Sequence, residues 1–299
     1  MPSRFRRLAL CLPLACAAAL LGAATATAQV VTIGSPLQGS FTWPAIAAAP
    51  ATFVNGTLAN TEAELVSPFD GAVIRWRMSE GFEGGPFRLQ VMKQGLNGVA
   101  VGGPMSAPVS GSEGTFTTNL PINEGQGIGI TTSGSAAVLG ARLSAATQNA
   151  DWFEYSPPLS PSGGVTPYSI QQEHQELGFN ADVLPTPTAT GLAAPIGATA
   201  GGTTVTITGT QFIMVSKVTF GSKPAASFKV ESENKIVATA PAGTPSSSVR
   251  VSVTTPAGTA TVPTKFTYAA KPKPNPKPKS KVKPKGSGPR PAHDGGLRG

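Results

Sequence analysis

Short runs in which apolar and polar residues alternate, each ended by glycine or proline, constrain the fold of this chain more than any other feature. In "GGTTVTITGTQF", residues 201–212, Val205 and Ile207 alternate with threonines before the run stops at Gly209. Alternation with a period of two is typical of a β-strand with one buried and one solvent-facing side. We expect Val205, Ile207 and Phe212 to be core side chains. The 35 glycines and 29 prolines favour short strands joined by turns over helices, so the chain is predicted to be all-β.

The N-terminus, residues 1–28, has the features of a secretory signal peptide. A positive start is followed by an apolar run over residues 8–21 and by Ala-Thr-Ala just before Gln29, the small-x-small pattern of a cleavage site. We therefore expect the mature protein to begin near Gln29 and to be secreted, extracellular or associated with the cell wall. A lipoprotein anchored at Cys16 is the alternative, although Pro13 stands where the lipid-attachment motif has an aliphatic residue. No later run is long and apolar enough to predict a transmembrane segment.

Cysteine and charge are both unevenly distributed. Both cysteines, Cys11 and Cys16, lie in the predicted signal peptide, so the mature protein should have no disulfide, thiolate metal site or cysteine nucleophile. Residues 271–299 hold seven lysines and two arginines against one acid, Asp294, a net charge of +8; residues 29–270 hold 11 basic and 14 acidic residues, a net charge of −3. The basic character of the chain therefore belongs to its tail. The positive net charge of the whole chain is thus no reason to predict that the folded part binds polyanions.

Residues 29–184 are predicted to form one β-sandwich of jelly-roll type. The runs "AVIRWRMSE" and "PFRLQVMK" both alternate, and we expect them to pair as an antiparallel hairpin through the glycine-rich residues 81–85. That pairing would place Arg75, Arg77 and Arg88 in one solvent-facing basic row.

Further strands of this sandwich are expected over residues 115–120, 127–131, 137–143 and 176–184, a spacing typical of a two-sheet sandwich. The last of them, "ELGFNADVL", predicts a strand with one apolar buried side and one polar exposed side. It runs directly into "PTPTAT", whose prolines stiffen the chain and remove backbone donors, so we place the domain boundary at residue 185.

Residues 185–269 carry a second set of short β patterns with the size and rhythm of an immunoglobulin-like sandwich. The order of its motifs is GGT-x-VTITG-x-x-F, then V-x-FG, an alanine-proline-alanine-glycine turn, V-x-V-TTP-x-GT and F-x-Y. This order resembles the IPT/TIG domain, an immunoglobulin-like fold shared by some transcription factors and extracellular receptors, over residues 187–269. The resemblance implies a sandwich used for packing, spacing or contact with a protein partner, and implies no catalytic residues. The first domain is left unassigned to a family.

Residues 270–299 are predicted to be a disordered tail. Proline at alternate positions favours an extended polyproline conformation, and the like charges repel one another. The tail either binds an anionic envelope polymer or polysaccharide through its lysines or serves only as a solubilising spacer. No aromatic residues lie between the lysines, so binding to a specific nucleic-acid sequence is not expected. The candidate polyanion-binding residues are Lys271, Lys273, Lys277, Lys279, Lys281, Lys283 and Lys285.

No catalytic set can be assembled from the sequence. There are only two histidines, His174 and His293, and no G-x-S-x-G motif. Acids of the first sandwich could supply the carboxylate pair of a glycosidase, but sequence spacing does not select a pair. These acids are Glu62, Glu64, Asp70, Asp151, Glu154, Glu173 and Glu176. The run "QQEHQE" could serve a cation, yet it lacks the oxygen-rich loop that calcium prefers. We predict no enzyme activity, no cofactor and no metal site.

Two groups of residues are candidates for ligand binding in the first sandwich. In "DWFEYSPPL", Trp152 or Tyr155 could expose a ring on which a sugar stacks, although the same aromatics could close the end of the sandwich. The basic row of Arg75, Arg77 and Arg88 could bind an anion, although such arginines are usually only solvated. The sequence thus predicts a non-catalytic surface binding or adhesion protein, with a carbohydrate-active or carbohydrate-binding protein and a self-associating structural protein as alternatives.

Overall fold

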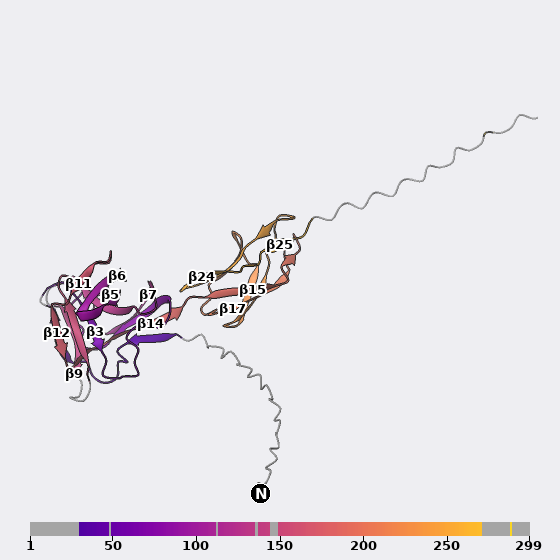
Figure 1. The fold of residues 1–299 in the computed structure, drawn as a ribbon. Helices are drawn as coiled ribbons and strands as arrows, with labels where there is room; N and C mark the ends of the chain where they lie inside the picture. The colour runs from indigo at the N-terminus through magenta and orange to yellow at the C-terminus, as the bar shows by residue number, and fades with distance from the viewer. Residues whose placement is uncertain are drawn as a thin grey trace, which may run out of the picture.

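The computed structural model describes residues 30–47, 49–111, 113–134, 137–143, 149–270 and 288. In these residues the chain forms strands β1 to β25 and one short 3₁₀ turn, η1 (Leu96–Gly98). Figure 1 shows two bodies of strands that are joined where β14 passes into β15. The predicted all-β fold is therefore confirmed. The predicted signal peptide and the lysine-rich tail lie outside the described residues.

The first body is a sandwich built from three sheets. The seven-stranded sheet has the order β11 (Val165–Pro167), β6 (Val99–Met105), β5 (Phe87–Gln94), β8 (Gly127–Thr132), β3 (Ala51–Thr57), β10 (Asp151–Tyr155) and β12 (Ile170–Glu173). A four-stranded sheet has the order β1 (Val31–Gly34), β14 (Phe179–Pro185), β4 (Gly71–Met78) and β7 (Gly114–Ile122), and a three-stranded sheet has the order β13 (Gln175–Leu177), β9 (Ala137–Leu143) and β2 (Trp43–Ala47). All three sheets contribute side chains to one core, in which Trp76, Phe53 and Phe179 are almost completely buried.

The expected hairpin between residues 72–80 and 86–93 is wrong. Strand β4 pairs with β14 and β7, whereas β5 pairs with β6 and β8 in the seven-stranded sheet. The connection between them crosses from one sheet to the other. It is held on the way, since Phe82 is fully buried in the core and Glu83 exchanges two backbone hydrogen bonds of 3.0 Å with Val138. A glycine-rich segment between two alternating strands was therefore no sign that the strands pair.

The segment expected as one half-exposed strand, residues 176–184, is also different. It is divided into β13 and β14 at Gly178, and Gly178 donates a backbone hydrogen bond of 2.9 Å to Gly140. Both sides of β14 are buried, so the polar residues Asn180 and Asp182 lie inside the structure instead of facing solvent. Buried polar side chains need hydrogen-bond partners. Asn180 and Asp182 find them in the backbone of Ser35 and in the arginines of β4.

The second body is a smaller sandwich of three sheets. Their orders are β15 (Thr188–Ala193), β17 (Thr204–Thr210), β21 (Lys235–Thr239) and β20 (Ser227–Ser232); β16 (Ile196–Gly197), β25 (Phe266–Tyr268) and β22 (Ser248–Val249); and β19 (Lys223–Pro224), β18 (Lys217–Phe220), β23 (Val251–Thr255) and β24 (Gly258–Thr261). Val205, Ile207 and Phe212 are core residues, as expected. Phe266 packs edge-on against Phe220 and Tyr268, with ring centroids 5.1 Å apart in both pairs.

The two bodies meet at a small apolar cluster. Leu184 of β14 is fully buried there together with Ala72 of the first body and Ala257 of the second, and Ile213 packs against the same cluster. The linker is also tied back to the first body, because the backbone nitrogen of Thr186 donates a hydrogen bond of 3.1 Å to the carbonyl of Asp70. The proline-containing segment is thus a short, fixed connection.

Candidate functional site

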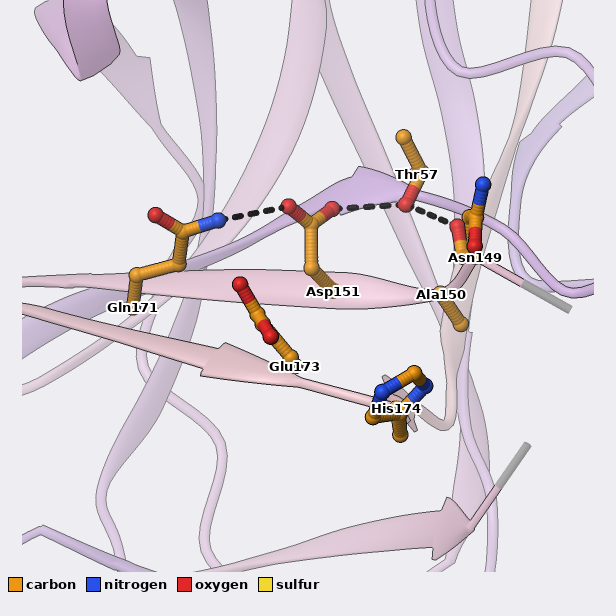
Figure 2. A pocket seen from close by; sticks show the side chains of 7 residues that line it. All are labelled: Thr57, Asn149, Ala150, Asp151, Gln171, Glu173 and His174. Atoms are coloured by element: carbon orange, nitrogen blue, oxygen red, sulfur yellow. Dashed lines mark hydrogen bonds between the residues drawn. The ribbon is translucent and has the colours of Figure 1, made fainter. Parts of the chain in front are cut away.

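A polar hollow of about 240 Å³ lies at the edge of the seven-stranded sheet, where β3, β10 and β12 run side by side. Figure 2 shows its lining side chains, which include Thr57, Asn149, Asp151, Gln171, Glu173 and His174. Thr57, Asp151 and Glu173 form one row across the three strands, because Asp151 is the cross-strand partner of both other residues. The hollow is therefore assembled by strand register from segments that are far apart in the sequence.

A bulge in β3 helps to orient this row. The pairing of β3 with β10 shifts between Asp151 and Trp152, which leaves Gly56 as the extra residue beside Thr57. A side chain at Gly56 would lie 2.3 Å from the ring of Phe153, so glycine is needed for close approach at this point. No period-two pattern around Gly56 indicates this bulge.

Asp151 is held in place by neutral hydrogen-bond donors. Its Oδ1 accepts a hydrogen bond of 2.6 Å from Thr57 Oγ1, and its Oδ2 accepts one of 3.1 Å from Gln171 Nε2. The hydroxyl of Thr57 also lies against the backbone carbonyl of Asn149. Each carboxylate oxygen has a second acceptor direction that these contacts leave open. The arrangement fixes the carboxylate and keeps acceptors for a ligand.

A second hollow of about 390 Å³ adjoins the first, and the two share Thr57 and Asn149 in their linings. It is bordered by the loop after β3, residues 58–65. The backbone nitrogen of Ala59 in this loop donates a hydrogen bond of 2.9 Å to Glu176 Oε2, and Arg142 Nη2 donates one of 2.9 Å to the same oxygen. The buried carboxylate of Glu176 on β13 thus holds the loop through Ala59 and forms an ion pair with Arg142 of β9. We call the two adjacent spaces the double hollow.

An exposed aromatic side chain that sequence reasoning missed packs on β10, the strand that carries Asp151. The ring of Tyr168 packs on Phe153 with a centroid distance of 5.2 Å, and Phe153 is the cross-strand partner of Gln171. Tyr168 is 39% exposed, and its ring lies against the backbone of Gly98, where any side chain would meet the ring at 2.3 Å. One signal in the sequence could have pointed to Tyr168. It follows Pro167 in a segment without period-two alternation, so no strand pattern predicts that its ring is buried.

The aromatics that the sequence suggested as a sugar platform do not form one. Trp152 is only 6% exposed, packs on Phe53 in the core and donates a hydrogen bond of 3.2 Å from Nε1 to Gln175 Oε1. Tyr155 is fully buried on the other side of β10, under the chain around Leu159, and burial raises the pKa of Tyr155 to about 12. Both sides of β10 are therefore covered, which alternation alone does not reveal.

The basic row is not a row either. Arg75 and Arg77 lie on β4 of the four-stranded sheet, whereas Arg88 lies on β5 of the seven-stranded sheet. Both arginines of β4 form ion pairs with the buried Asp182, and Arg88 Nη1 donates a hydrogen bond of 2.9 Å to the carbonyl of Ser106. The three guanidinium groups are therefore bound to groups of the protein itself. They lie on two different sheets and do not form the expected anion-binding patch.

Two buried acids of the first sandwich have pKa values that are shifted in opposite directions. Burial alone would raise the pKa of Asp182, but hydrogen bonds from Arg77, Arg75 and Thr32 lower it to about 2. Glu154 is 8% exposed and points away from Asp151, on the opposite side of β10, and burial raises its pKa. Of the acids proposed as a glycosidase pair, only Asp151 and Glu173 are brought directly opposite each other.

The cation alternative for Glu173, His174 and Glu176 is not assembled. Glu176 points into its buried ion pair, while Glu173 and His174 line the hollow, and His174 adopts a left-handed backbone with a φ of 60° where β12 ends. Among the described residues no group of three or more His, Cys, Asp and Glu side chains could hold a metal ion. In the same part of the chain no helix is long and apolar enough to cross a membrane.

Residues 187–268, the smaller sandwich, match the family model of the IPT/TIG domain. The chain contains an IPT/TIG domain. The resemblance inferred from the motifs is thereby confirmed, and the IPT/TIG domain is compatible with a surface binding protein and with contacts to a protein partner. No curated protein matches the chain.

Two solved structures share weak similarity with the chain. One is SGBP-B from a complex xyloglucan utilization locus in Bacteroides uniformis, 16% identical over 58% of this chain and 48% of that chain, with a TM-score of 0.24. The other is the plexin A4 full extracellular region, 17% identical over 68% of this chain and 17% of that chain, with a TM-score of 0.28. The chain thus spans about half the length of the first structure and about a sixth of the second.

Proposed function

We propose that this protein is a secreted or cell-surface binding protein without catalytic activity. The double hollow of the first sandwich holds the ligand, and the IPT/TIG domain serves as a spacer or protein-contact module. The observation that carries the proposal is that the carboxylates of the hollow lie at an open sheet edge, where both oxygens of Asp151 are already held by neutral donors. General acid catalysis at neutral pH needs a carboxyl group whose pKa burial has raised. Glu154, the acid of β10 in that condition, points to the opposite side of the strand.

The experiment compares retention with turnover. Residues 29–299 are incubated with insoluble and soluble polysaccharides, and bound protein and newly formed reducing ends are measured in the same samples. Retention without reducing ends supports the proposal. Release of reducing ends that is lost in both Asp151→Asn and Glu173→Gln, but kept in Glu113→Gln on an exposed loop, contradicts it.

A carbohydrate-active enzyme is the second candidate, and one observation favours it. Asp151 and Glu173 face each other on neighbouring strands, and directly opposed residues have Cβ atoms about 5 Å apart. Retaining glycosidases place two carboxyl groups at a similar separation. The reducing-end measurement above separates this candidate from pure binding.

The tail is assigned a second, separable role, attachment to an anionic envelope polymer. Seven lysines in residues 271–285, spaced by prolines, support this assignment, since such contacts act by counterion release and weaken steeply with salt. Residues 29–299 and 29–270 are cosedimented with cell-wall sacculi across a salt series. The tail is the anchor if only the longer protein pellets and salt releases it; equal pelleting of both proteins contradicts this role.

A further inference from the structure

We propose that the ligand of the double hollow is a neutral glycan chain, one sugar of which stacks on Tyr168. The inference deepens the proposed function and rests on it, because it names the ligand class of the same site. Three features of the described residues support it: a fixed, exposed aromatic ring, a polar lining without lysine or arginine, and a space made of two adjacent hollows.

The ring of Tyr168 is held in a position suited to stacking. One part of it rests on Phe153 and another on the backbone of Gly98, so the side chain loses little further freedom when a ligand binds. Its exposed fraction of 39% leaves ring surface for the apolar side of a sugar. Phe153 in turn is the cross-strand partner of Gln171, which lines the hollow, so the ring of Tyr168 is linked to the lining through Phe153.

The polar lining offers hydrogen-bond partners of the type that hydroxyl groups need. Asp151 and Glu173 provide acceptors, while the side chains of Asn149 and Gln171 combine donors with acceptors. The amide nitrogen of Gln171 donates a hydrogen bond to Asp151, which fixes the orientation of both side chains before a ligand binds. Such a pre-arranged set of planar polar groups beside an aromatic ring can recognise alternating apolar and hydroxyl surfaces.

Charge selects against acidic glycans. None of the described residues that line the two hollows is lysine or arginine, whereas two carboxylates are present. An anionic sugar would therefore meet two carboxylates without a lysine or arginine to compensate them. The two hollows, about 240 and 390 Å³, share two lining residues, which suits a chain of several sugars better than a single small molecule.

The test begins with the full mature chain, residues 29–299, on an array of neutral, acidic and amino-sugar glycans. The tightest neutral oligosaccharide is then titrated calorimetrically against variants. Tyr168→Ala should raise Kd by at least about tenfold, and Gln171→Ala by several-fold, because each removes a ligand contact. Tyr168→Phe keeps the ring on Phe153 and should bind like the parent, which separates loss of stacking from loss of folding.

Matched controls use exposed aromatics elsewhere. Trp43 of β2 is 50% exposed and Phe228 of β20 is 37% exposed, so Trp43→Ala and Phe228→Ala remove comparable surface away from Tyr168. Both variants should bind the oligosaccharide unchanged. Loss of binding in Trp43→Ala with retention in Tyr168→Ala overturns the location of the site.

The outcomes distinguish the ligand class from the proposed function. Binding only to amino-sugar polymers or other polycations, or to no neutral glycan on the array, overturns the glycan inference but leaves a non-catalytic binding protein in place. Hydrolysis of the array glycans contradicts the proposed function itself. Neutral-glycan binding that depends on Tyr168 and is insensitive to salt supports both.

Discussion

Arg77 donates two hydrogen bonds to Asp182, of 2.8 Å from Nη1 to Oδ1 and 2.7 Å from Nη2 to Oδ2, across neighbouring strands β4 and β14. Arg75 pairs with the same carboxylate, and Thr32 on β1 donates a further hydrogen bond of 2.8 Å. One buried acid therefore connects three of the four strands of this sheet. Asp182 is buried while Arg75 and Arg77 are partly exposed, so the carboxylate depends on the arginines to compensate its charge.

Asp182→Asn should destabilise the first sandwich by about 2 kcal/mol at neutral pH. The folded pKa of Asp182, about 2, lies below its ordinary value of 3.8. Its stabilising contribution is therefore present above pH 3.8 and is lost as the pH falls through about 2. Denaturant unfolding followed by tryptophan fluorescence at several pH values measures this, because all three tryptophans lie in the first sandwich, and the difference from the parent should shrink towards pH 2.

A matched control for that experiment is Glu62→Gln, which changes an exposed acid of the same sandwich. It should leave stability within about 0.5 kcal/mol of the parent. Equal stability of Asp182→Asn and the parent at pH 7 would show that the network does not stabilise the fold.

Glu154→Gln should stabilise the protein at neutral pH by roughly 1 kcal/mol, because an uncharged amide is less costly to bury than a carboxylate. Burial raises the folded pKa of Glu154 above its unfolded value. The contribution of this acid to stability is thus fully present below the unfolded pKa and is lost as the pH rises through the folded pKa. Melting temperatures of parent and variant should converge in acid and diverge towards pH 8; a variant that is less stable than the parent at pH 8 contradicts the prediction.

The sequence predicted those parts of the fold that depend on local pattern. Residues 137–143 form β9 with the expected bounds, and Val205 and Ile207 are in the core of the IPT/TIG domain. These predictions succeed because period-two alternation reports which side of a strand is buried. The motif order of residues 187–269 succeeded for another reason, since it resembles a known family.

The predictions that failed depend on which strands become neighbours. Whether Asp182 faces water or pairs with Arg75 and Arg77 is decided by the pairing of β14 with β4, and no local pattern encodes that pairing. Likewise, Tyr155 is buried because residues around Leu159 fold back over the seven-stranded sheet. The candidate site itself arises from the register of β3, β10 and β12, so its residues could be named from the sequence only singly.

The contact between the two sandwiches gives a further prediction. Ala257 is 8% exposed in the cluster that also contains Leu184 and Ile213, and Ala257→Glu would place a charge there. Because burying an unpaired charge is unfavourable, the two sandwiches should separate while each stays folded. Small-angle X-ray scattering should show a broader distribution of interdomain distances, and proteolysis near Thr188 should become several-fold faster. Ala257→Ser, which adds no charge, should behave like the parent, and unchanged scattering of Ala257→Glu would show that the cluster does not hold the sandwiches together.

The last prediction concerns Gly243 of the IPT/TIG domain, which lies against the ring of Tyr268. A side chain at Gly243 would meet the ring at 2.2 Å, while the hydroxyl of Tyr268 donates a hydrogen bond of 2.9 Å to the carbonyl of Pro241. Tyr268→Phe should cost about 1 kcal/mol, since it removes this hydrogen bond and keeps the ring. Gly243→Ala should cost more, about 2 kcal/mol, because the ring, packed on Phe266, must move. Thermal unfolding of the IPT/TIG domain in both variants measures the order; a smaller loss in Gly243→Ala than in Tyr268→Phe would show that the ring is free to shift and that the hydroxyl contact dominates.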